Sequence, residues 1–344
     1  FRSIMQLVTG QNIKACNIED QPAFNWRGYM VDVGRNYQSM DLILKQIDIM
    51  SQYKLNVFHF HLTEDIAWRL YSHLYPSLTN SKNMLRNQGM FYTIQDLKKI
   101  NNYCKERHIK LLIEIDMPGH SAAFKRALGV DMQSSEGVAI CKNILAEICD
   151  SIDFDYIHIG GDEVEYKHKN FLNEMIDFLE LKNKKVIVWS PGGQVKNGAI
   201  VQLWNGKSVP QNVYPSIDSR HLYLNHFDPL EGVVTVFNHK IDDVPVGDSL
   251  HLGATLCNWP DRNVQKEADL INMNAVYPIM LAFSERTWRG GGWENYKSDF
   301  GKPGSERYEA FVEFENRLLV HQGMYFNNLS FPYVQQSKDR KSVV

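Results

Sequence analysis

The sequence is short of cysteine, of long apolar stretches and of net charge, and each shortage argues against a class of protein. Its five cysteines show no Cys-x-x-Cys spacing, which argues against a disulfide-built scaffold or a zinc finger; they are Cys16, Cys104, Cys141, Cys149 and Cys257. No stretch of about 18 apolar residues is present, so we expect no membrane span. A net charge of -3 gives no reason to expect a nucleic acid partner.

The sequence does contain a repeated alternation of strand-like and helix-like segments. Its 344 residues are enough to bury one large core. Strands are predicted at 26–33, 55–62, 109–115, 155–159, 185–189, 199–204, 222–225 and 253–259, and helices at 39–53, 93–107, 134–150, 170–182, 266–286 and 306–322. Such βα repeats predict an α/β fold with a parallel sheet, here a closed (β/α)8 TIM barrel. The long stretches 206–220 and 226–250 are expected to be loops.

The most informative segment is His158–Glu163, His-Ile-Gly-Gly-Asp-Glu, where a short apolar strand runs through two glycines into adjacent acids. Neighbouring side chains of a strand point to opposite faces, so adjacent acids seldom meet in one cavity. The glycines allow a bulge through which Asp162 and Glu163 converge, which predicts an acid/base site for sugar or metal chemistry. A solvated turn with an N-capping aspartate is the alternative interpretation.

Polar and aromatic residues follow the other predicted strands as well. The carboxyl ends of barrel strands face one pocket, so we expect these side chains to meet there. In strand order they are Arg35, Glu64, Asp116 with His120, Asp162 with Glu163, Trp189, Trp204, Tyr223 with Asn225, and Trp259 with Asp261. The tryptophans predict an aromatic box around a sugar ring, with polar residues on its hydroxyls. Repulsion between adjacent acids should raise one pKa, as a proton donor near neutral pH requires.

Motifs at four strand ends resemble the catalytic domain of family-20 glycoside hydrolases, the β-N-acetylhexosaminidases. They are Trp26–Arg35, Tyr53–Asp65, Glu114–Ser121 and His158–Glu163, within a likeness that spans about residues 20–325. The resemblance implies an exo-acting, retaining enzyme that removes terminal β-linked N-acetylglucosamine or N-acetylgalactosamine from an oligosaccharide or glycoconjugate. It implies no metal and no organic cofactor.

The resemblance also implies a role for each matching residue. Glu163 is the acid/base, Asp162 holds the substrate's acetamido N–H, and Tyr223 donates to the acetamido carbonyl oxygen. That oxygen is the nucleophile, so an oxazolinium intermediate forms by substrate-assisted catalysis, an exception to the two-carboxylate scheme. The implied substrate-binding residues are Trp189, Trp204 and Trp259 around the acetamide and the ring, Arg35, Glu64, Asn225 and Asp261 at the hydroxyls, and His120 as support.

Two residues depart from the family pattern. Glu64 stands where the family usually has Asp, and Asp261 stands where it usually has Glu. The shorter Asp261 leaves room near O4 and O6 of the sugar, and Arg262 follows it. A variant specific for 6-sulfo-N-acetylglucosamine, with Arg262 binding the sulfate, is therefore an alternative hypothesis.

The chain is expected to have three parts. Residues 23–325 are interpreted as the catalytic (β/α)8 domain, residues 1–22 as the remnant of a preceding domain or linker, and residues 326–344 as a C-terminal tail. No signal peptide is visible, and the start at Phe1 is consistent with a processed N-terminus. The compartment is left open, with export to the periplasm, cell surface or medium as one interpretation, and so is the oligomeric state.

The sequence leaves two rival functions open. A metal-dependent TIM-barrel amidohydrolase would use an HxH pair such as His59 and His61, together with His120, His158 and Asp162. That pair lies on the second predicted strand rather than the first, so we expect both histidines to pack inside the barrel. A catalytically inactive sugar-binding protein is the second rival. It would be expected to lack Glu163 or Tyr223, and both are present.

Overall fold

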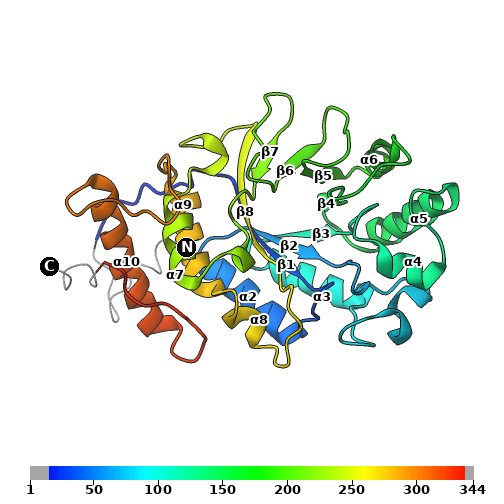
Figure 1. Cartoon of the computed structure of the whole chain (residues 1–344), viewed down its shortest axis with the longest axis horizontal. Coiled ribbons are helices and arrows are strands. Elements are labelled where there is room, and N and C mark those ends of the chain that lie inside the picture. The colour runs from blue at the N-terminus through cyan, green and yellow to red at the C-terminus, as the bar shows by residue number, and fades with distance from the viewer. Residues whose placement is uncertain (1–14, 338–344) are drawn as a thin grey trace.

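Eight strands form one closed, all-parallel barrel in sequence order (Figure 1). The computed structural model describes residues 15–337, so positions 1–14 of the predicted leader and 338–344 of the predicted tail lie outside it. The strands are β1 (Trp26–Asp32), β2 (Val57–His61), β3 (Lys110–Glu114), β4 (Tyr156–His158), β5 (Lys185–Ser190), β6 (Ile200–Leu203), β7 (Ser216–Asp218) and β8 (His251–Asn258). The predicted (β/α)8 barrel is confirmed.

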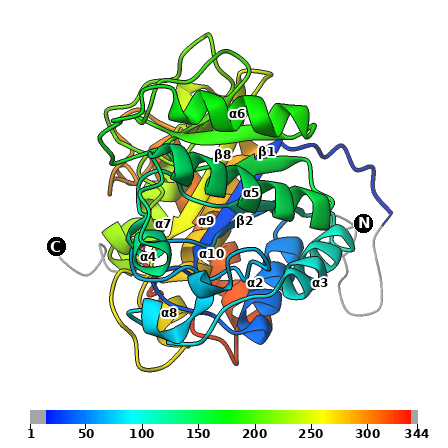
Figure 2. The same cartoon turned by 90° about the vertical axis from the view of Figure 1, so that its right-hand side faces the viewer.

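Helices cover the outside of the barrel. They are α2 (Met40–Gln52), α3 (Ile94–Lys105), α4 (Ala122–Leu128), α5 (Ser135–Ser151), α6 (Phe171–Leu181), α7 (Pro229–Asn238), α8 (Asp269–Asn272), α9 (Val276–Arg289) and α10 (Glu306–Tyr325). Helices α5 and α6 lie side by side on the face turned to the viewer in Figure 2. Within residues 15–337, no helix separates β5 from β6 or β6 from β7.

The predicted helix starts are confirmed where a side chain caps the first turn. Ser39, Thr93 and Ser134 accept hydrogen bonds from the N–H groups of the helices that follow them. Thr93 forms a full capping box, because Asp96 also accepts from the Thr93 N–H. Each cap satisfies a backbone donor that the helix itself leaves unpaired.

The second half of the barrel departs from the prediction in three places. The seventh strand is Ser216–Asp218, inside the expected loop 206–220, and the segment predicted as that strand, 222–225, follows it as a turn and a short 3-10 helix. The expected loop 226–250 contains α7, which Asp228 caps by accepting from two backbone N–H groups. The predicted helix 266–286 is divided into α8 and α9, because Ala275 takes a left-handed conformation with φ 46°.

The barrel interior changes character along its axis. At the amino ends of the strands it is apolar, with Trp26, Val57, Leu112, Ile187, Ile200 and Ile217 packed together. Two residues further along three of these strands, the inward positions are polar or aromatic: His59, Glu114 and Trp189. Alternate strand residues share a face, so this polar layer lies directly below the carboxyl ends, where barrel sites lie.

Helix α10 closes one edge of the molecule beyond α7 and α9 (Figure 1). Phe314 of α10 stacks on Phe237 of α7 with ring centroids 4.7 Å apart. Residues 326–337 have no regular secondary structure, yet Phe326, Phe331 and Tyr333 are buried. Among the described helices, none is long and apolar enough to cross a membrane.

Candidate active site

The turn after β4 brings the two adjacent acids to the carboxyl end of the barrel. Gly160 and Gly161 have φ values of 68° and 107°, a region that favours glycine. A Cβ on Gly160 would lie 1.7 Å from Asp116 Oδ1, so the turn needs glycine for space as well as for conformation. The turn leaves the Glu163 side chain 55% exposed, while Asp162 Oδ1 is buried and has no hydrogen-bond partner. The two acids therefore lie at the same site, but the Glu163 side chain is exposed and Asp162 Oδ1 is buried.

Asp162 lies beside a second carboxyl group, Asp116, which is fully buried. Burial raises the pKa of Asp162 to about 6, and nearby His120 partly opposes this. Burial and the Asp162 charge raise the pKa of Asp116 well above its ordinary value, so Asp116 stays protonated when Asp162 ionises. The Gly161 N–H donates to Asp116 Oδ1 over 3.3 Å, which fixes the turn.

A chain of ionic contacts links β1 and β2 to Glu163. Arg35 contacts Asp32 and Glu64, each at 2.8 Å. Burial alone would lower the pKa of Arg35, but Asp32, Glu64 and Asp261 together raise it. Glu64 Oε2 lies 3.3 Å from His120 Nδ1, and His120 Nε2 lies 3.5 Å from Glu163 Oε2. The sequence predicted Glu64 as a hydroxyl ligand, whereas in the structure its carboxylate is only 3% exposed and holds these two neighbours.

His120 is the cation between the two glutamates. Burial lowers its pKa, but Glu64, Asp116 and Asp162 raise it to about 10 overall. The pKa of Glu64 is lowered far below its ordinary range, because His120, His61 and Arg35 outweigh its burial. His120 is therefore an imidazolium at neutral pH, with one N–H for each glutamate.

The predicted aromatic residues form one wall of the site. Trp189, Trp259, Tyr223 and Trp204 belong to one cluster with Met30 and Cys257. Ring centroids are 6.1 Å apart for Trp189 and Trp259 and 5.6 Å apart for Tyr223 and Trp259. Burial raises the pKa of Tyr223 well above its ordinary value, so its hydroxyl stays a donor. Although Tyr223 lies outside the short β7, it pairs with Cys257 as an isolated parallel bridge, which brings it to the site.

The outer rim is made by residues after β7 and β8. Asn225 donates from Nδ2 to Asp261 Oδ2 over 2.6 Å, and Asp261 Oδ1 lies 3.6 Å from Arg35 Nε. The Asp261 side chain is 53% exposed, and Asn225 Oδ1 is buried without a partner. This rim offers both acceptors and donors to a ligand. The structure thus brings all eleven predicted site residues to one end of the barrel.

Sequence reasoning missed the part that Glu114 plays. This fully buried carboxylate accepts from the Trp189 indole N–H over 2.8 Å and hydrogen-bonds His59 Nε2 over 2.8 Å. A signal was present, since Glu114 is an acid inside an apolar strand at an inward position. His59 and His61 lie inside the barrel as predicted, with no exposed surface.

Several groups of acids and histidines are close enough to share a metal ion, including His59 with Glu114 and His158. In that group the Glu114 carboxylate already accepts from Trp189 and bonds His59. A catalytic metal site keeps a position open for water or substrate, and this layer is fully buried. Its geometry therefore fits a hydrogen-bonded hub better than a metal centre.

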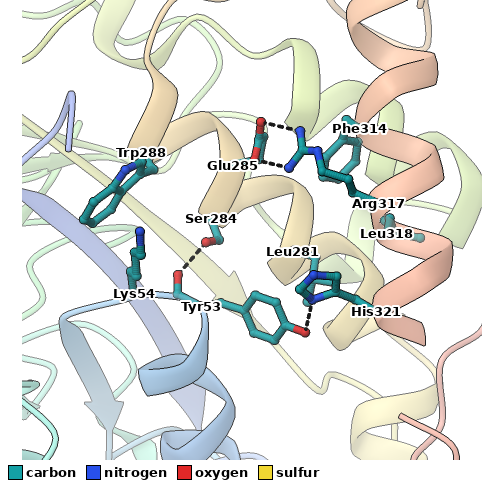
Figure 3. Close-up of a pocket in the computed structure, with 10 residues that line it drawn as sticks. All are labelled: Tyr53, Lys54, Leu281, Ser284, Glu285, Trp288, Phe314, Arg317, Leu318 and His321. Carbon is teal, nitrogen blue, oxygen red and sulfur yellow. Dashed lines mark hydrogen bonds and ion pairs between the residues drawn. The ribbon is translucent and has the colours of Figure 1, made fainter. Parts of the chain in front are cut away.

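A separate cavity of about 270 Å³ lies between the end of α2 and helices α9 and α10 (Figure 3). Tyr53 Oη contacts His321 Nδ1 at 3.0 Å across it, and Arg317 pairs with Glu285 at 2.9 Å. Ser284 also donates to the main-chain oxygen of Tyr53, so most of the polar groups drawn there bond to one another. None of the predicted site residues lines this cavity.

Comparison with known proteins supports the resemblance to family-20 glycoside hydrolases that the motifs predict. Residues 24–136 match the family model of the glycosyl hydrolase family 20 catalytic domain. The chain is 28% identical over 357 residues to a beta-hexosaminidase of Porphyromonas gingivalis, covering 82% of this chain and 45% of that protein. It is 26% identical over 319 residues to beta-hexosaminidase 3 of Arabidopsis thaliana, covering 79% of this chain and 58% of that protein. The chain thus spans about half the length of these relatives.

A solved structure agrees with both comparisons. The beta-N-acetylhexosaminidase of Bacteroides fragilis superposes with a TM-score of 0.77 at 28% identity, covering 94% of this chain and 76% of that one. The family model, the relatives and the solved structure together support a catalytic domain of the glycosyl hydrolase family 20 type in this chain.

Proposed function

We propose that this domain is an exo-acting, retaining β-N-acetylhexosaminidase that uses the substrate's own acetamido group as nucleophile. The observation that carries the proposal is the buried, unpartnered Oδ1 of Asp162 beside an aromatic wall. A buried acceptor without a donor is costly, and an amide N–H from the ligand would satisfy it. The curated relatives are named beta-hexosaminidases, which supports the same class of substrate.

In the first step the acetamido carbonyl oxygen attacks the anomeric carbon while Glu163 gives its proton to the glycosidic oxygen. The bond to the leaving group breaks, and a positively charged oxazolinium ring forms. The ionised Asp162 accepts the N–H of that ring and stabilises its charge, and the Tyr223 hydroxyl orients the attacking oxygen. These preorganised groups act where charge develops, which is the most effective place for them.

In the second step Glu163 takes a proton from water, and the resulting hydroxide attacks the anomeric carbon from the face that the leaving group vacated. The ring opens, the acetamide is restored, and the configuration is retained. The His120 imidazolium lies 3.5 Å from Glu163 Oε2 and stabilises the carboxylate that remains when Glu163 has given up its proton. That carboxylate is the base of the second step.

The decisive experiment compares 4-nitrophenyl N-acetyl-β-glucosaminide with the matching β-glucoside, which lacks the acetamide. We expect turnover of the first only, release of the β-anomer by NMR, and tight binding of N-acetylglucosamine thiazoline, which mimics the cyclised intermediate. Glu163→Gln should abolish turnover and keep thiazoline binding. Equal hydrolysis of both glycosides would refute the mechanism, and ligand binding by the wild-type chain without turnover would favour the sugar-binding alternative.

The preference for a 6-sulfated sugar stays a prediction. The main-chain oxygen of Arg262 accepts from Asn36 Nδ2 over 2.9 Å, which anchors this residue next to the exposed Asp261. Turnover of 6-sulfo and unsubstituted nitrophenyl N-acetylglucosaminides tests the idea directly. An advantage for the sulfated compound that disappears in Arg262→Gln would support it, and no advantage in the wild type would end it.

A further inference from the structure

The buried layer below the site is built around one carboxylate, Glu114 of β3. His59 and His61 of β2, His158 of β4 and Trp189 of β5 all direct a ring nitrogen at it, at distances of 2.8, 2.6, 3.0 and 2.8 Å. All five side chains are at most 1% exposed. A carboxylate in such a place stays ionised only if its neighbours offset the lost hydration. Here burial raises the pKa of Glu114, and the three histidines more than reverse it.

One oxygen of Glu114 serves the aromatic wall. Its Oε1 accepts the Trp189 indole N–H, which fixes the rotation of a ring that has little other polar support. His158 Nδ1 lies 3.0 Å from the same oxygen and 3.0 Å from the backbone nitrogen of Gly160, at the start of the turn that carries the two acids. The wall and the turn thus meet at one anchor.

The other oxygen of Glu114 faces the ionic chain. His61 Nδ1 lies 2.6 Å from Oε2, and His61 Nε2 lies 3.5 Å from Glu64 Oε1. Burial lowers the pKa of His61, but Glu114 and Glu64 raise it well above its ordinary value. The imidazolium therefore joins a carboxylate inside the barrel to one at the rim. From there the contacts continue through His120 to Glu163.

We propose that Glu114 is a positioning residue for the hydrolysis: one oxygen fixes Trp189 in the pocket wall, and the other, through His61, holds Glu64 under His120. The inference rests on the proposed function and adds to it a buried anchor that touches no substrate. Two effects follow that a purely structural carboxylate would not produce. The Trp189 branch acts on binding of the acetamide, and the His61 branch acts on the pH dependence of turnover.

The chain offers a matched control in His59. It lies on the same strand as His61, is equally buried and bonds the same oxygen of Glu114, but no contact joins it to Glu64. The charged and titratable groups that act on His61 are Glu114, Glu64, Asp32, Asp116, Asp162 and His59. Both variants keep all these groups except the exchanged histidine, so they differ in the link to Glu64 and in the positive charge, because burial lowers the pKa of His59 to about 4.

The experiment compares His61→Gln with His59→Gln by pH profiles of kcat and by urea unfolding. We expect comparable losses of stability, but only His61→Gln should lower kcat about tenfold or more and move the basic limb of its profile up by about half a unit or more, because the site loses one positive charge. Identical profile shapes in the two variants would overturn the inference. If His61→Gln does not fold, His61→Asn and His59→Asn carry the same comparison.

The Trp189 branch has its own test. Trp189→Phe keeps an aromatic ring but removes the donor to Glu114 and part of the indole surface, so we expect KM and the thiazoline Kd to rise about fivefold or more with an unchanged pH profile. Glu114→Leu, which removes both acceptor oxygens, should combine this rise in KM with the lower kcat of His61→Gln. A pH shift in Trp189→Phe, or an unchanged KM in Glu114→Leu, would contradict the inference. Failure of the wild type to cleave the N-acetylglucosaminide would instead refute the proposed function itself.

Discussion

Replacement of Gly160 by alanine should damage the turn that carries the two acids. The backbone φ of 68° places an L-residue in the left-handed region, which costs about 1–2 kcal/mol. The new Cβ would lie 1.7 Å from Asp116 Oδ1 and 2.9 Å from Asp116 Cα, so the Asp116 side chain has to move. That movement breaks the bond from the Gly161 N–H and leaves a buried donor unpaired, which costs about 1–3 kcal/mol. We expect a total loss of about 2–5 kcal/mol.

Gly129 provides the control for the backbone term. It has nearly the same φ, 72°, at the end of α4, and an added Cβ would meet nothing within 4 Å. Gly129→Ala should therefore lose only about 1–2 kcal/mol of unfolding free energy and keep its activity. Urea unfolding gives the two free energies, and kcat/KM with the nitrophenyl N-acetylglucosaminide gives the effect on the site. If Gly160→Ala matches Gly129→Ala in both measurements, the clash with Asp116 has no part in shaping the turn.

Three further predictions concern charge and metal. Burial raises the pKa of Asp162 to about 6, so the wild-type kcat/KM should fall about tenfold per pH unit below that value. Asp162→Asn should lose this acid limb of the profile together with most of the activity. A wild-type profile that is flat down to pH 4 would contradict this. Arg35→Lys keeps the charge but cannot make the contacts to Asp32, Glu64 and Asp261 together, so kcat/KM should drop at least about tenfold, whereas an unchanged value would show that the charge alone suffices. Dialysis against EDTA should leave turnover unchanged, while a proportionate loss that zinc reverses would favour the metal-dependent alternative.

The agreement between sequence and structure is best where the signal is local. Strands β1 to β5 and the caps at Ser39, Thr93 and Ser134 follow from periodicity and from the chemistry of short polar side chains. The seventh strand did not follow, because Ser216–Asp218 is only three residues long and contains one apolar side chain. Helix α7 was missed because its valines favour extended structure when they are taken alone. There the packing of α7 on α9 decides the outcome.

The sequence by itself determined the barrel, the position of the acids after its fourth strand, and the set of residues that meet at its carboxyl end. Strand order and the period of two are enough for that, since parallel strands in a closed barrel end on one rim. Only the tertiary structure decided what each side chain does there. Whether Glu64 meets a sugar or a histidine, and whether Glu114 is a core residue or an anchor, depends on contacts between strands that are distant in sequence. Burial shared among those strands sets the protonation of Asp116, Asp162 and His61, and no single segment carries that information.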